Sequence, residues 1–89
     1  MDMRFNQNIV KSIFLDCFHS NYYKAVKAVA DNVETLCKIT DYSKDDAIID
    51  LCNQVAKYCG TWLESGWLID MAYKEMARRE MVSEISRKW

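Results

Sequence analysis

The chain contains no proline and only two glycines, Gly60 and Gly66, among its 89 residues. Strand-rich folds of this size need more turn-forming residues than that, whereas long helices joined by short polar loops do not. With 51% hydrophobic and 28% charged residues, the composition is that of a globular chain rather than a disordered one. The sequence therefore predicts an all-α fold, in a single helical domain over residues 1–89.

Hydrophobic periodicity divides the chain into four segments, which predict helices over about 5–18, 22–39, 44–59 and 62–88. Loops this short make neighbouring helices antiparallel, so we expect a small four-helix, up-and-down, bundle-like domain with a long C-terminal helix. Apolar residues of the first segment fall outside its main stripe, and we expect that helix to be buried on more than one side. The inward stripe of the second segment comprises Tyr22, Val26, Val29, Val33, Leu36 and Cys37.

Polar residues at fixed spacings mark where the later helices begin. Ser43 and Asp46 have the spacing of a capping box with Asp in place of Glu, and Thr61 and Glu64 form a second one. Gly60 between them suits the residue that follows a helix end. Gly66 leaves two readings of the last helix: it continues through this residue, which we expect, or it breaks at 65–66 and restarts.

The last predicted helix carries apolar residues on two faces. One face, predicted to pack on the other helices, holds Trp62, Gly66, Ile69, Tyr73, Met76 and Ala77. The other holds Leu63, Trp67, Met71, Met81, Ile85 and Trp89, with Val82 beside it. An unbroken helix of this length spans roughly 40 Å, more than the ~30 Å width of a small domain, so its end would overhang the bundle. Such an exposed apolar patch favours association, whereas a bend at Gly66 would return both faces to the core.

Four cysteines and one histidine are the residues that raise the question of metal or thiol chemistry. Structural zinc sites bring ligands in close pairs such as C-x2-C, and Cys17, Cys37, Cys52 and Cys59 contain no such pair. Cys17 and His19 are two residues apart, but on a helix they point about 160° away from each other. The cysteines occupy apolar helix positions, where a thiol behaves as a small hydrophobe. We therefore expect reduced cysteines, no metal, no cofactor and no catalytic residue.

The distribution of charged residues along the chain disfavours nucleic-acid binding. Asp41, Asp45, Asp46 and Asp50 form an acidic run that we interpret as a solvated helix-capping cluster, and as a possible electrostatic contact for a basic partner. These carboxylates repel phosphate, and the basic residues of the last helix follow acids at i,i+4 spacing, as in Asp70–Lys74, Glu75–Arg79 and Glu84–Lys88. The net charge of −1 attracts neither nucleic acid nor an anionic membrane.

No stretch of the chain matches a family signature, so the expected function rests on surface chemistry. We expect a non-enzymatic helical interaction module, a homodimer that also binds an unidentified protein and modulates or inhibits it; small helical chains of this kind include regulators encoded by phages and mobile elements. The polar N-terminal residues and the absence of a long apolar run favour a cytoplasmic location without a membrane segment. The alternative is a small DNA-binding regulator that uses the basic side of the last helix. The expected interface residues are Trp67, Met71, Arg78, Met81, Ile85 and Trp89.

Overall fold

The computed structural model describes residues 7–19, 21–59 and 64–88, and within these ranges it is helical, with no strand. The helices are α1 (Gln7–Phe18), α2 (Tyr22–Ile39), α3 (Lys44–Cys59) and α4 (Ser65–Lys88). The observed bounds of α2 and α3 coincide with the predicted ones. The predicted residues 5–6 of the first helix lie outside the described residues. The predicted start of the last helix at Trp62 is wrong, because Glu64 is not helical and α4 begins at Ser65.

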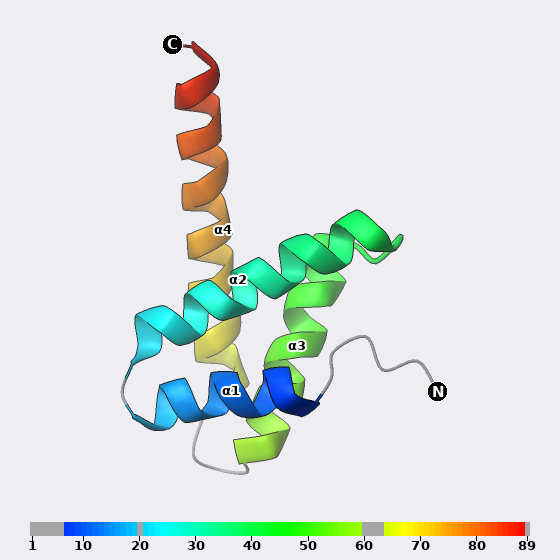
Figure 1. Cartoon of the computed structure of the whole chain (residues 1–89), viewed down its shortest axis with the longest axis vertical. Helices are drawn as coiled ribbons and strands as arrows, with labels where there is room; N and C mark the ends of the chain where they lie inside the picture. Colours follow the sequence, from blue (N-terminus) through cyan, green and yellow to red (C-terminus); the bar gives the residue numbers. More distant parts are fainter. Residues whose placement is uncertain (1–6, 20, 60–63, 89) are drawn as a thin grey trace.

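Successive helices reverse direction along the chain, but they do not all align with one axis. The α1–α2 pair lies across α3 and α4, which run along the long axis of the molecule (Figure 1). Among the described residues α2 contacts each of the other helices, and α4 packs on α2 and α3 but not on α1. The molecule measures 44 × 32 × 19 Å. The C-terminal turns of α4 extend beyond the other helices, as Figure 1 shows.

Short hydrogen bonds fix the corner between α2 and α3. The Thr40 hydroxyl and backbone N–H both donate to the Leu36 carbonyl, at 2.9 and 3.1 Å, and end α2. The Ser43 side-chain oxygen accepts the Asp46 N–H at 3.1 Å, as the capping pattern predicts. By contrast, Asn21 precedes α2 without a side-chain capping bond.

One face of each helix packs into the hydrophobic core. The α2 stripe is buried from Val26 to Leu36, but Tyr22 at its start is exposed, contrary to expectation. The buried residues of α1 are Val10, Ile13 and Cys17. Of the three apolar residues outside the predicted stripe, Leu15 and Phe18 are exposed and Phe14 is partly buried against the core, so the expected burial on a further side is met only in part, by Phe14. From α3, the buried residues are Ala47, Ile48, Leu51, Cys52 and Val55.

Helix α4 begins at Ser65 and includes Gly66 in its first turn, so it does not restart at Trp67. Residues 62–63, where the predicted continuous helix begins, lie outside the described residues. The buried face of α4 differs from the predicted one. Met76 is buried as predicted, but Leu68, Ala72 and Glu75 are buried with it, whereas Ala77 is exposed. Ile69 and Tyr73 are only partly buried. The core face is thus rotated by about 100°, or one residue, from the predicted face.

None of the described helices combines the length and apolar character that a membrane span requires.

Candidate functional site

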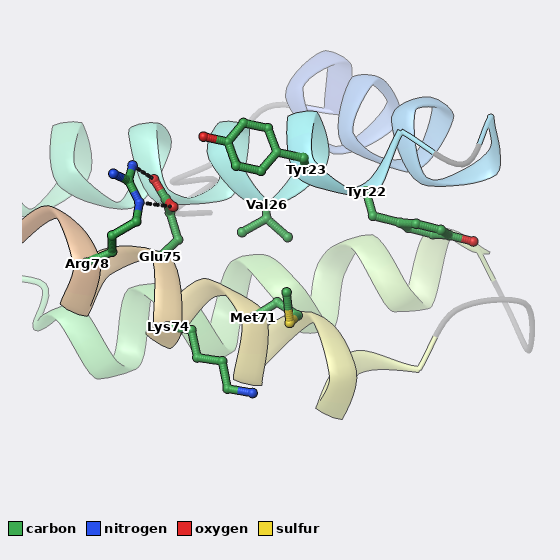
Figure 2. A pocket seen from close by; sticks show the side chains of 7 residues that line it. All are labelled: Tyr22, Tyr23, Val26, Met71, Lys74, Glu75 and Arg78. Atoms are coloured by element: carbon green, nitrogen blue, oxygen red, sulfur yellow. Dashed lines mark hydrogen bonds and ion pairs between the residues drawn. The ribbon is translucent and has the colours of Figure 1, made fainter.

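A groove opens between the start of α2 and the first half of α4. It encloses about 270 Å³, and it is lined by Tyr22, Tyr23, Val26, Met71, Lys74, Glu75 and Arg78. Val26 and Met71 point toward each other across it, with Tyr22 at one end and the Arg78–Glu75 pair at the other (Figure 2). We refer to this set of seven residues as the groove.

Helix spacing explains why these side chains meet. Tyr22 and Val26 are four residues apart on α2, and Met71, Lys74 and Arg78 follow one another at intervals of three and four on α4. Trp67 precedes Met71 by one turn, and its ring meets that of Tyr22 edge-on, with centroids 5.2 Å apart. The groove therefore continues into an aromatic pair at its Tyr22 end.

Large apolar side chains around the groove remain open to solvent. Tyr23 is 65% exposed, and Tyr22 and Trp67 are also exposed. Further along α4, Met81 is 63% exposed. Exposed aromatic and methionine side chains beside an arginine have the composition of an energetic hot spot in protein interfaces.

An ion cluster closes the Arg78 end of the groove. Glu75 is only 6% exposed, and its carboxylate accepts two hydrogen bonds from Arg78, at 3.0 and 2.8 Å, and one from Arg79 at 2.8 Å. Arg79 also contacts Asp31 at 2.8 Å and Glu34 at 3.1 Å, which joins α4 to α2. The predicted Glu75–Arg79 pair is thus present, within a larger cluster.

The cluster keeps Glu75 ionised. Hydrogen bonds from Arg78, followed by those from Arg79, lower the pKa of Glu75 to about 2, against the opposing effect of its burial. A carboxylate with so low a pKa and with both oxygens already bonded is unsuited to proton transfer near neutral pH. The polar end of the groove therefore suits recognition rather than acid–base catalysis.

The predicted interface residues are divided between three places. Met71 and Arg78 line the groove and Trp67 borders it, while Met81 lies beyond it on α4. Neither the Ile85 side chain nor Trp89 is among the described parts of the chain. Tyr22 and Tyr23 are surface residues that the sequence pattern did not predict. The signal was present in the two consecutive aromatic residues at the start of a helix, because both cannot face the same core.

The acidic residues lie away from the groove, and part of their role is structural. Asp45 accepts a hydrogen bond from the Tyr73 hydroxyl at 3.0 Å, which links α3 to α4. Asp41 and Asp46 are exposed and Asp50 is partly buried. Burial, followed by the bond to Asp45, raises the pKa of Tyr73. The proposed electrostatic contact for a basic partner stays a prediction.

The cysteine environments match those of inert core residues. Cys17 and Cys52 are buried and Cys37 is partly buried, while the Cys59 side chain lies outside the described residues. Burial raises the pKa of the Cys52 thiol to about 12, which opposes formation of the reactive thiolate. Within the described ranges, no group of three or more His, Cys, Asp and Glu residues is placed to hold a metal.

The basic residues of α4 whose side chains are described have acidic neighbours. Lys74 contacts Asp70 at 3.1 Å, and Arg79 contacts three carboxylates. Such pairing reduces the positive charge available to phosphates. The Arg87 and Lys88 side chains are not described.

Comparisons of the chain with protein-family models, with curated proteins and with solved structures found no match.

Proposed function

We propose that the protein is a non-enzymatic helical interaction module that binds another protein through the groove and thereby modulates or inhibits it. The observation that carries this proposal is the groove itself, where apolar side chains of two helices meet under exposed tyrosines. Groups of Tyr, Trp, Met and Arg supply much of the binding energy in protein interfaces.

The open shape of the groove favours a protein ligand over an enclosed small molecule. Pockets for drug-sized ligands enclose about 300–1,000 Å³ and bury most of the ligand. The groove encloses about 270 Å³ and is open along the surface. Its dimensions suit one or two apolar side chains of a partner that covers the surrounding surface as well.

The proposal keeps the homodimer predicted from the sequence and assigns it to the end of α4. Met81 and Val82 of α4 are 63% and 50% exposed. We assign self-association to the stretch from Val82 to Trp89, where the sequence predicts apolar residues, and this leaves the groove and Met81 for a second protein. A cytoplasmic location and a phage or mobile-element origin remain part of this proposal.

The test of the partner hypothesis is affinity purification from the native host with three forms of the protein. Wild type is compared with Met71→Asp, which places a charge in the groove, and with Ile49→Asp. Ile49 is an exposed apolar residue of α3 and serves as the matched control. We expect the same proteins to be recovered with wild type and Ile49→Asp and lost with Met71→Asp.

Circular dichroism must show that both variants retain their helices, and the activity of the recovered protein is then measured with and without the purified chain. Recovery of the same proteins with Met71→Asp would exclude the groove as the binding site. If binding weakens steeply between about 50 and 200 mM salt and nucleic acid is recovered, the DNA-binding alternative is correct instead.

A further inference from the structure

The outward side of α4 carries the spacing by which one helix packs on another. Trp67, Met71, Lys74, Arg78 and Met81 follow at alternating intervals of four and three residues, and we call them the outer stripe. This spacing is that of a helix–helix seam. Four of the five are exposed and Met71 is partly buried, while the core face of α4 is formed by Leu68, Ala72 and Met76. The spacing of the outer stripe thus suits packing against a helix from another molecule.

The two central residues of the outer stripe, Lys74 and Arg78, are hydrogen-bond donors, and the exposed Asp70 carboxylate lies beside Lys74. Glu75, the one carboxylate of the groove, already accepts bonds from Arg78 and Arg79. Arg78 uses its Nε and one terminal nitrogen on Glu75, and its second terminal nitrogen has no partner among the described residues. Its side chain is 54% exposed, so this edge of the guanidinium remains available to an incoming carboxylate.

Lys74 adds a second cation at the same place. It contacts only Asp70 among the described residues, and this contact lies at the surface. A surface pair of this kind contributes little and is easily exchanged for another partner. Two cationic side chains therefore occupy consecutive positions of an otherwise apolar stripe.

Charge disfavours a second copy in the register that would pair the methionines of two outer stripes. Antiparallel pairing of two outer stripes that sets Met71 opposite Met81 of the second copy also sets Lys74 opposite its Arg78. Like charges facing each other across a helix seam disfavour that pairing and select a partner of opposite charge.

We propose that the groove and outer stripe bind an amphipathic helix of the partner protein, whose apolar side chains enter the groove and whose carboxylates meet Lys74 and Arg78. This inference rests on the proposed function and adds the chemistry of the partner. Apolar contact supplies the area that is buried, and the two cations select an acidic helix over a neutral or basic one.

Alanine-based helical peptides of about 18 residues, with leucines at the seam positions, serve as probes. Three versions carry Glu, Gln or Lys at the two central seam positions. Binding is measured from the methyl NMR signal of Met71, with buried Met76 as the internal reference. We expect the Glu peptide to shift the Met71 signal and to bind about tenfold tighter than the Gln peptide, with the Lys peptide weakest.

Charge reversal at Lys74 gives the decisive variant, because this side chain is exposed and lies outside the ion cluster of Glu75. Lys74→Glu should reverse the preference, so that the Lys peptide binds best. Lys57→Glu, at an exposed position of α3, should leave the preference unchanged. Arg78→Gln should lower the advantage of the Glu peptide without reversing it.

Equal binding of the Glu and Gln peptides, or no shift of Met71 with any peptide, overturns the inference. A Met71 shift that grows with protein concentration alone also overturns it, because a second copy then occupies the groove. If the host proteins are lost with Met71→Asp but retained with both Lys74→Glu and Arg78→Gln, the proposed function stands and only the acidic-helix inference fails.

Discussion

Replacing Glu75 by glutamine removes the charge of the buried carboxylate and keeps its size. The lowering of its pKa from 4.5 to about 2 corresponds to an upper bound of about 3 kcal/mol in the free energy of unfolding. Its first partner, Arg78, is about half exposed, and solvent screening reduces the expected effect to about 1–2 kcal/mol. We expect Glu75→Gln to lower the free energy of unfolding at pH 7 by this amount, measured by urea denaturation with circular dichroism.

The direction of the pKa shift determines how the stabilisation by Glu75 changes with pH. Because the folded-state pKa is lowered, the stabilisation is present above the unfolded-state value of 4.5 and is lost as the pH falls toward about 2. The difference between wild type and Glu75→Gln should therefore stay constant from pH 7 to about 5.5 and shrink below 4.5. Glu80→Gln is the matched control, since Glu80 makes one surface ion pair with Lys44, and it should change stability by less than about 0.5 kcal/mol. Equal effects of the two variants, or a difference for Glu75→Gln that persists unchanged at pH 3, refute the reasoning.

Three further predictions concern single sites. A Cβ at Gly66 meets no atom within 4 Å, so Gly66→Ala should stabilise the chain by about 0.5–1 kcal/mol and raise the melting temperature by a few degrees; a lower melting temperature contradicts an open helical site. Ser43→Ala removes the capping oxygen of α3 and should cost about 0.5–2 kcal/mol in urea denaturation, with Ser12→Ala, exposed on α1, as a neutral control. Buried Cys52 should be alkylated at pH 8 much more slowly than Cys37, as mapped by mass spectrometry, and the difference should vanish in denaturant; comparable native rates contradict the raised pKa.

The helical fold and most helix ends were predictable because local signals determine them. The capping spacing of Ser43 and Asp46 fixes the start of α3, and the regular valines of α2 identify its buried face. Local signals failed at the start of α4. Glu64, predicted inside the helix, instead accepts a backbone hydrogen bond from Leu68 and stands just before the first turn.

The rotation of α4 was not predictable, because apolar residues surround its first half on every side. Trp67, Leu68 and Ile69 are consecutive, so no single direction stands out from the sequence. What selects Leu68 for the core is packing on α2 and α3, which one helix alone cannot specify. The burial of Glu75 was not predictable either. The i,i+4 spacing predicts its pairing with Arg79, but it gives no sign of the two carboxylates of α2 that complete the cluster.

The ion cluster and the groove depend on each other. Arg79 joins α4 to Asp31 and Glu34 of α2, and Glu75 holds both Arg79 and Arg78, so the same carboxylate fixes the helix crossing and the end wall of the groove. Met71 and Val26 are thereby held on opposite sides before a partner arrives. Binding to a groove formed in advance costs less ordering entropy than binding to one that must assemble. If the groove binds a protein as proposed, the buried charge at Glu75 contributes to recognition by keeping two apolar walls apart, even though both of its oxygens are already bonded within the chain.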